Sequence, residues 1–131
     1  MNVTGKTVLL TGGSAGIGRE IARQLQAKGA AVILTGRDPA RLAAMEAEGF
    51  QTLAADLSNA AGVDALVAAL GDRPIDVLIN NAGLGGLKPV VEMTDQEWNL
   101  VLDVTLTGTM RMTRAAILNV MQSAYIETAE L

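Results

Sequence analysis

Short apolar runs alternate along this chain with longer segments in which apolar residues recur every three or four positions. The runs predict β-strands over Thr7–Thr11, Ala31–Thr35, Gln51–Ala55 and Val77–Asn80. The periodic segments predict helices over Gly16–Lys28, Pro39–Glu48, Ala60–Gly71 and Asp95–Met121, the last in one piece or two. Strands that alternate in this way with helices are typical of βαβ units and a parallel sheet.

Residues at the predicted helix starts support these boundaries. Asp38 precedes Pro39, Ser58 is the expected cap of the third helix, and Thr94 has the capping-box spacing to Glu97. Right-handed crossovers then give an α/β, doubly wound parallel sheet with strand order 3-2-1-4 and helices on both faces. In this topology we expect a ligand crevice over the carboxyl ends of the first and fourth strands.

A glycine-rich turn, TGGSAGIG over residues 11–18, links the first predicted strand to the first helix. Gly12 lets the chain turn sharply, Gly16 leaves room for a pyrophosphate, and Gly18 lets the helix pack close to the sheet. The first amides of that helix have no intrahelical partner and carry the positive end of its dipole, so they suit an anion. The turn therefore predicts a dinucleotide-binding unit rather than an ordinary glycine-rich loop.

A second motif, NNAG over residues 80–83, lies at the end of the fourth predicted strand. Together the two motifs resemble the short-chain dehydrogenase/reductase family, which has T-G-x-x-x-G-x-G after its first strand and N-N-A-G after its fourth. The resemblance extends from about Lys6 to about Met121. It implies a Rossmann-like dinucleotide-binding domain over residues 1–121, truncated relative to the family, and a tail over residues 122–131 that does not resemble it.

The resemblance also implies a cofactor. Where NAD-binding members carry an acid at the end of the second strand, this chain has Gly36 followed by Arg37. A guanidinium suits a 2′-phosphate, and Ser14 resembles the family's second contact to that phosphate. We therefore expect NADP(H), with NAD(H) as the less favoured alternative. Arg37 can instead be a solvated loop charge, and Asp38 can either pair with Arg37 or cap the next helix.

Further cofactor contacts are implied by the family pattern. Asp56 and Leu57 correspond to residues that contact the adenine, although Asp56 also suits a turn or a helix cap. The motif that contains Asn81 corresponds to a block beside the cofactor's ribose, where small residues permit close approach. The expected cofactor site comprises Gly12, Ser14, Gly16, Ile17, Gly18, Arg37, Asp56, Leu57, Asn81, Ala82 and Gly83.

The family's catalytic serine and its Tyr-x-x-x-Lys pair have no counterpart among these residues. The only tyrosine, Tyr125, is followed four positions later by Ala129, and no lysine occurs after Lys88. Thr105 stands where the family carries a catalytic asparagine. We therefore expect an oxidoreductase by descent whose 131 residues do not catalyse alone. A non-catalytic nucleotide-binding or assembly module and a truncated remnant are the alternatives, and the substrate cannot be inferred.

The amino-acid composition argues against several classes of partner and site. A net charge of −4 gives no basic surface for nucleic acid or an anionic membrane. The absence of Cys and His excludes disulfides and nearly all zinc sites. Because the sequence has neither a hydrophobic signal segment nor a membrane-spanning run, we expect a cytoplasmic protein.

Two predicted surfaces favour self-association. The apolar fourth strand, with Val77, Leu78 and Ile79, lacks the family's next strand and becomes a sheet edge. The last predicted helix carries Leu102, Leu106 and Met110 at helical spacing, and its stripe of Met110, Met112 and Met121 is most simply a packing face. The family resemblance implies that this helix contributes to a dimer interface. We expect a homo-oligomer, and coverage of the edge by the chain's own tail is the competing solution.

Overall fold

A computed structural model describes the backbone of residues 1–85 and 88–129, with side chains except those of residues 118 and 122–129. Its elements are β1 (Thr7–Leu10), α1 (Gly16–Ala27), β2 (Ala31–Gly36), α2 (Pro39–Ala47), β3 (Gln51–Ala54), α3 (Ala60–Leu70), β4 (Val77–Ile79), η1 (Val90–Glu92), α4 (Asp95–Leu102), η2 (Asp103–Thr107) and α5 (Gly108–Ala129). The four predicted strands are confirmed to within one residue at each end, as are the first three helices.

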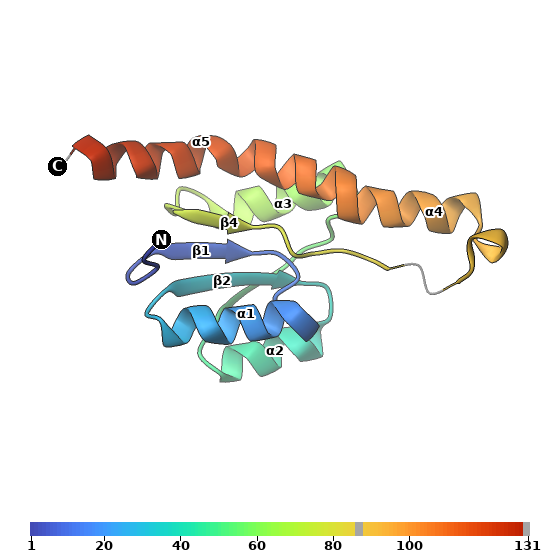
Figure 1. Cartoon of the computed structure of the whole chain (residues 1–131), viewed down its shortest axis with the longest axis horizontal. Coiled ribbons are helices and arrows are strands. Elements are labelled where there is room, and N and C mark those ends of the chain that lie inside the picture. The colour runs from blue at the N-terminus through green and yellow to red at the C-terminus, as the bar shows by residue number, and fades with distance from the viewer. Residues whose placement is uncertain (86–87, 130–131) are drawn as a thin grey trace.

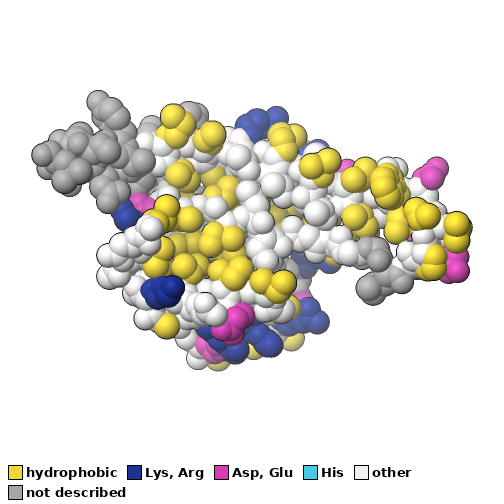
Figure 2. All heavy atoms as spheres, in the orientation of Figure 1, with side chains coloured by type: hydrophobic (Ala, Val, Ile, Leu, Met, Phe, Trp, Pro, Cys, Tyr) yellow, Lys and Arg dark blue, Asp and Glu magenta, His cyan; other side chains and the backbone are white. Residues whose placement is uncertain are grey.

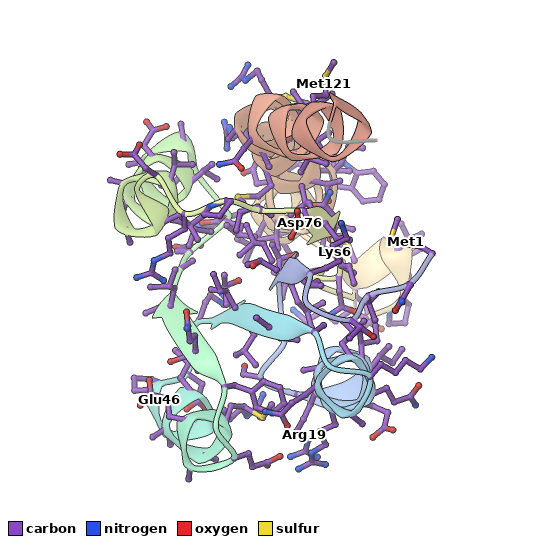
Figure 3. All side chains as sticks on the ribbon, turned by 90° about the vertical axis from the view of Figure 1, so that its left-hand side faces the viewer. Met1, Lys6, Arg19, Glu46, Asp76 and Met121 are labelled. Carbon is purple, nitrogen blue, oxygen red and sulfur yellow. The ribbon has the colours of Figure 1, made fainter. Side chains whose placement is uncertain are left out.

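The strands form one parallel sheet in the order β3-β2-β1-β4, which confirms the predicted topology. Helices α1 and α2 cover one face, while α3 and α5 cover the other (Figures 1 and 3). The loops after β1, β2, β3 and β4 therefore emerge at one edge of the sheet, where the crevice was expected.

Alternate residues of the central strands fill two separate cores. Val8 and Leu10 pack toward α1 and α2, and Leu9 packs toward α3 and α5. The neighbouring strand behaves in the same way, with Leu34 in the first core and Ile33 in the second. Both faces of these strands are covered, which explains why the sequence shows continuous apolar runs rather than strict alternation.

The N-caps largely agree with the sequence-based expectation. The Asp38 carboxylate accepts the backbone N–H groups of Ala40 and Arg41, and Thr94 forms the predicted capping box with Glu97. The prediction of Ser58 as the third cap is wrong. Asn59 caps α3 by accepting the Gly62 N–H at 2.8 Å, because the chain remains non-helical for one residue longer.

The segment predicted as one helix over Asp95–Met121 consists of α4, the π-helical turn η2 and α5. Helix α5 continues through Ala129, so the predicted boundary at residue 121 does not coincide with the end of an element. Residues 130 and 131 of the predicted tail lie outside the described residues. Treating residues 122–131 as a separate tail remains a prediction.

The predicted interface residues on this segment divide between core and surface. Met112 is fully buried in the second core, so it packs within the chain, as a packing face requires, and not at an interface between copies. Leu106, Met110 and Met121 are exposed, and α4 adds the half-exposed Trp98. The exposed face therefore extends along both helices.

Strand β4 pairs only with β1 within the described part of the chain, so its other side is an edge. Partly buried apolar side chains beside this edge pack against the first core, namely Val3, Ile21, Leu25, Val77 and Ile79. Figure 2 shows apolar side chains gathered on this side, between α1 and α5. This edge and the exposed helix face are the two surfaces at which the sequence predicted self-association.

Candidate nucleotide-binding site

Gly12 and Gly18 let the turn after β1 and the start of α1 pack closely. Gly12 has φ +67°, and a Cβ there would lie 2.9 Å from the Cα of Ala82. A Cβ on Gly18 would lie 2.2 Å from the carbonyl oxygen of Gly12 and 2.5 Å from Nδ2 of Asn81. The turn and the start of α1 therefore pack directly against the loop after β4, as the roles assigned to Gly12 and Gly18 require.

The start of α1 has uncapped amides and open space. Ala15 occupies the N-cap and has no side-chain cap, whereas α2, α3 and α4 are each capped by a side chain. Gly16 has φ +52°, and a Cβ there would meet no atom within 4 Å. The first amides of α1 are thus suited to an anionic group, because no side chain of the cap competes for them.

A hydrogen-bond network around Thr11 joins the two glycine-containing motifs. The buried Thr11 Oγ1 accepts the N–H groups of Asn81 at 3.1 Å and Ala82 at 3.0 Å. Asn81 Nδ2 donates to the carbonyl oxygens of Thr11 at 3.2 Å and Gly12 at 3.0 Å. Asn81 therefore fixes the glycine turn through its backbone carbonyl groups. Thr11 is a positioning residue that was not among the site residues expected from the sequence.

A cavity of about 290 Å³ lies at the carboxyl ends of the strands. Seven of the expected site residues line it: Gly12, Ser14, Arg37, Asp56, Leu57, Ala82 and Gly83. Ala15, Thr35, Gly36, Asp38, Arg41, Ala55, Leu84 and Val104 complete the lining. The other four expected residues do not line it: Gly16, Ile17, Gly18 and Asn81. The Ile17 side chain is 76% exposed on α1.

Arg37 lies at the end of this cavity where β2 finishes. Asp38 does not neutralise it, since the Asp38 carboxylate caps α2 and lies 3.7 Å from Arg41 Nε. Among the described residues Arg37 makes no ion pair. Ser14 is buried against Gly36 in the same corner. This corner therefore offers a guanidinium and a hydroxyl to an anion.

Asp56 faces the same part of the cavity from the end of β3. Its Oδ1 accepts the Ser58 N–H at 2.9 Å, which makes the turn that the sequence left open. Hydrogen bonds from Ser58 lower the pKa of Asp56, and the charge of Arg37 lowers it further. The carboxylate is thus held ionised as a hydrogen-bond acceptor at the cavity wall.

Thr105 contacts Leu84, a further residue of the cavity lining. Its Oγ1 accepts the Leu84 N–H at 3.1 Å and lies 3.4 Å from the Leu84 carbonyl oxygen as a donor. Val104, the preceding residue, is buried and lines the cavity. No sequence signal could have revealed the role of Val104, because it depends on how η2 packs against two loops.

Within the described ranges 1–85 and 88–129, no group of acidic residues could hold a metal ion. No helix in the same ranges is long and apolar enough to cross a bilayer.

The family model for short chain dehydrogenase matches residues 6–125. A solved structure of a short chain dehydrogenase/reductase family protein is 34% identical with a TM-score of 0.82, over 91% of this chain and 51% of that one. L-Sorbose reductase from Gluconobacter frateurii, complexed with NADPH and L-sorbose, is 29% identical with a TM-score of 0.79, over 92% and 50%.

Curated relatives give the same result. An NADP-dependent 3-hydroxy acid dehydrogenase of Salmonella typhi is 40% identical over 84% of this chain and 47% of its own length. A hydroxy-methyl-oxo-hexahydroindene-carboxyl-CoA reductase of Mycobacterium tuberculosis is 42% identical over 86% and 47%. The chain thus spans about half the length of the curated relatives it matches. By sequence and by fold, it belongs to the short-chain dehydrogenase/reductase family of oxidoreductases.

Proposed function

We propose that this chain binds NADP(H) in the cavity at the carboxyl ends of its strands and prefers it to NAD(H). The observation that carries the proposal is the corner formed by Ser14, Gly36 and Arg37, which offers two donors and has no acid at position 36. The neighbouring Asp38 carboxylate is engaged in the cap of α2. Similar proteins are described as NADP-dependent or were solved with NADPH, which supports the same choice.

Each part of the cavity suits one part of this cofactor. Arg37 and Ser14 would hold the 2′-phosphate, and the ionised Asp56 would accept from the adenine amino group beside Leu57. The uncapped amides at Gly16, Ile17 and Gly18 would bind the pyrophosphate, and Asn81, Ala82 and Gly83 would lie beside the ribose. The bound cofactor would supply a hydride.

Calorimetric titration tests the proposal with three ligands: NADPH, NADH and adenosine 2′,5′-bisphosphate. NADPH should bind more tightly than NADH, and the bisphosphate should bind because Arg37, Ser14 and Asp56 all face the adenosine end. Equal affinities for NADPH and NADH would refute the preference. If none of the three ligands binds, the site has lost its nucleotide function and the remnant interpretation is favoured.

We further propose that these residues do not reduce a carbonyl by themselves. The described cavity lining contains no tyrosine or lysine, and the Thr105 hydroxyl is engaged with the Leu84 backbone. A panel of ketones with NADPH tests this proposal, with and without intact relatives. Turnover by the purified chain that is abolished by Tyr125→Phe would contradict it and would identify the acid.

Self-association is the last part of the proposal. The β4 edge and the exposed face of α4 and α5 are two apolar surfaces that a second copy of the chain could cover. Each Å² of apolar surface that a second copy removes from water contributes about 25 cal/mol to association.

A cytoplasmic location, expected from the sequence, also remains a prediction, and cell fractionation would test it.

A further inference from the structure

The helical segment beside the cavity contains one turn that is not α-helical. Across η2, the Gly108 N–H donates to the Asp103 carbonyl oxygen five residues earlier, in place of the usual four. The extra residue rotates α5 by about 100° relative to a continuous α-helix. The side chains of α5 therefore point in other directions than they would if α4 continued as one α-helix. The π turn η2 contributes Val104 to the lining of the nucleotide cavity.

One contact of this turn is made by Thr105. Its hydroxyl engages both polar backbone groups of Leu84, by accepting the N–H at 3.1 Å and donating toward the carbonyl at 3.4 Å. Leu84 comes directly after the NNAG motif and lines the cavity. The hydroxyl therefore sets the position of the loop after β4.

Gly108 makes a second contact at the end of the same turn. A Cβ on Gly108 would lie 2.8 Å from the Leu57 carbonyl oxygen, which is backbone and cannot move aside cheaply. Leu57 is the residue after Asp56 in the loop after β3 and also lines the cavity. Glycine at position 108 therefore sets how closely α5 approaches that loop.

Val104, in the same turn, belongs to the cavity wall. Its side chain is 7% exposed and lines the cavity together with Leu57, Gly83 and Leu84. The π turn thus supplies one wall of the cavity and, at the same time, holds the two loops that flank this wall.

We infer that the π turn Asp103–Thr107 is a brace for the nucleotide cavity, with Thr105 and Gly108 as positioning residues for the loops at Leu84 and Leu57. The inference rests on the proposed nucleotide binding. Thr105 acts on the loop after β4, away from the corner of Arg37 and Asp56, whereas Gly108 acts on the loop that carries Asp56. The two residues should therefore affect different parts of a bound dinucleotide.

The Thr105 contact is tested by comparing Thr105→Val, Thr105→Ser and Thr4→Val. Thr105→Val keeps the shape and removes the hydroxyl, and we expect NADPH to bind about tenfold more weakly, as for one lost hydrogen bond. Adenosine 2′,5′-bisphosphate should bind as before, and Thr105→Ser should restore NADPH binding. Thr4→Val is the matched control, because the Thr4 hydroxyl also donates to a backbone carbonyl, that of Lys28, and Thr4 lies outside the cavity lining.

The Gly108 contact is tested by Gly108→Ala, which should weaken both NADPH and adenosine 2′,5′-bisphosphate. Unchanged NADPH binding in Thr105→Val, or an equal loss in Thr4→Val, would overturn the brace. If the unmodified chain binds neither nucleotide, it is the proposed function that fails. Amide exchange then decides on the brace: Thr105→Val should accelerate exchange at Leu84 and Thr4→Val should not, and equal rates would refute it.

Discussion

The hydroxyl of Ser14 lies where a side chain at position 36 would begin. A Cβ built on Gly36 would be 2.5 Å from Ser14 Oγ and 3.1 Å from Ser14 Cβ. Leu42 adds a further close contact, with its Cδ2 at 3.2 Å. Position 36 is thus a glycine instead of an acid. The space that an acidic side chain would need there is filled by Ser14, which we propose as a hydrogen-bond donor to the 2′-phosphate.

This relationship predicts that cofactor preference cannot be reversed at position 36 alone. Gly36→Asp should weaken NADPH binding through charge repulsion without producing tight NADH binding, because Ser14 displaces the new carboxylate. Adding Ser14→Gly frees the space. The gain in NADH binding free energy of the double variant should then exceed the sum of the two single effects by about 0.5–3 kcal/mol. Calorimetry on the four proteins measures this coupling. Strictly additive effects would mean that the Ser14 hydroxyl simply rotates away.

The Arg37 guanidinium should account for most of the preference for NADPH over NADH. Loss of a charged hydrogen bond to the 2′-phosphate costs about 1.5–3 kcal/mol. Arg37→Ala should reduce NADPH affinity by this amount and leave NADH affinity nearly unchanged. Arg114→Ala is the control, since it removes the same charge from an exposed position on α5. An equal loss in both variants would point to overall charge rather than to a site.

Alanine at Gly18 should act mainly on stability, whereas alanine at Gly16 should act mainly on NADPH binding. Gly18→Ala places a methyl group 2.2 Å from the Gly12 carbonyl, so the free energy of unfolding should fall by about 1–3 kcal/mol or more. Gly16→Ala meets no protein atom and costs only the strain of its positive φ, about 1–2 kcal/mol. The folded Gly16→Ala protein should nevertheless bind NADPH more weakly. Urea unfolding and calorimetry separate the two effects, and undiminished binding by Gly16→Ala would exclude close approach of the pyrophosphate there.

The free energy of unfolding should depend on pH through Glu97, which lies in the first turn of α4. A hydrogen bond from Lys88 and bonds with Thr94 lower the pKa of this carboxyl from 4.5 to about 2. Because the folded-state pKa is the lower one, the stabilisation is complete above pH 4.5 and is lost as the pH falls toward 2.

A carboxyl NMR titration measures this pKa directly. Lys88→Ala should raise the Glu97 midpoint, and the difference in unfolding free energy between the unmodified chain and Glu97→Gln should shrink below pH 4.5. A Glu97 midpoint near 4.5 in the unmodified chain would show that the contacts with Lys88 and Thr94 do not persist in solution.

Light scattering at micromolar concentration should give a mass above the 13.6 kDa of one chain. Trp98, the only tryptophan, is 51% exposed on the face of α4, so its emission reports on that surface. A blue shift with rising concentration would assign the contact to α4 and α5, and an unchanged spectrum in an oligomer would assign it to the β4 edge. A single species of 13.6 kDa at all concentrations would refute self-association.

Local sequence determined most of this architecture. The apolar runs and the helical spacing set the order of the elements, since these periods reflect the strand and helix geometry of each segment. The glycines at 12 and 18, and the caps at Asp38 and Thr94, were also readable, because turns and caps depend on residues close in sequence.

Only the tertiary structure decided what depends on residues far apart. Thr11 and Asn81 are 70 positions apart, and their hydrogen bond exists because β1 and β4 are neighbours in the sheet. Met112 proved to be core and Ile17 to be exposed, because packing against the sheet selects which face of a helix is covered. The π turn likewise reflects the simultaneous contacts of Thr105 and Gly108 with two loops. Helical periodicity within one segment carries no information about either loop.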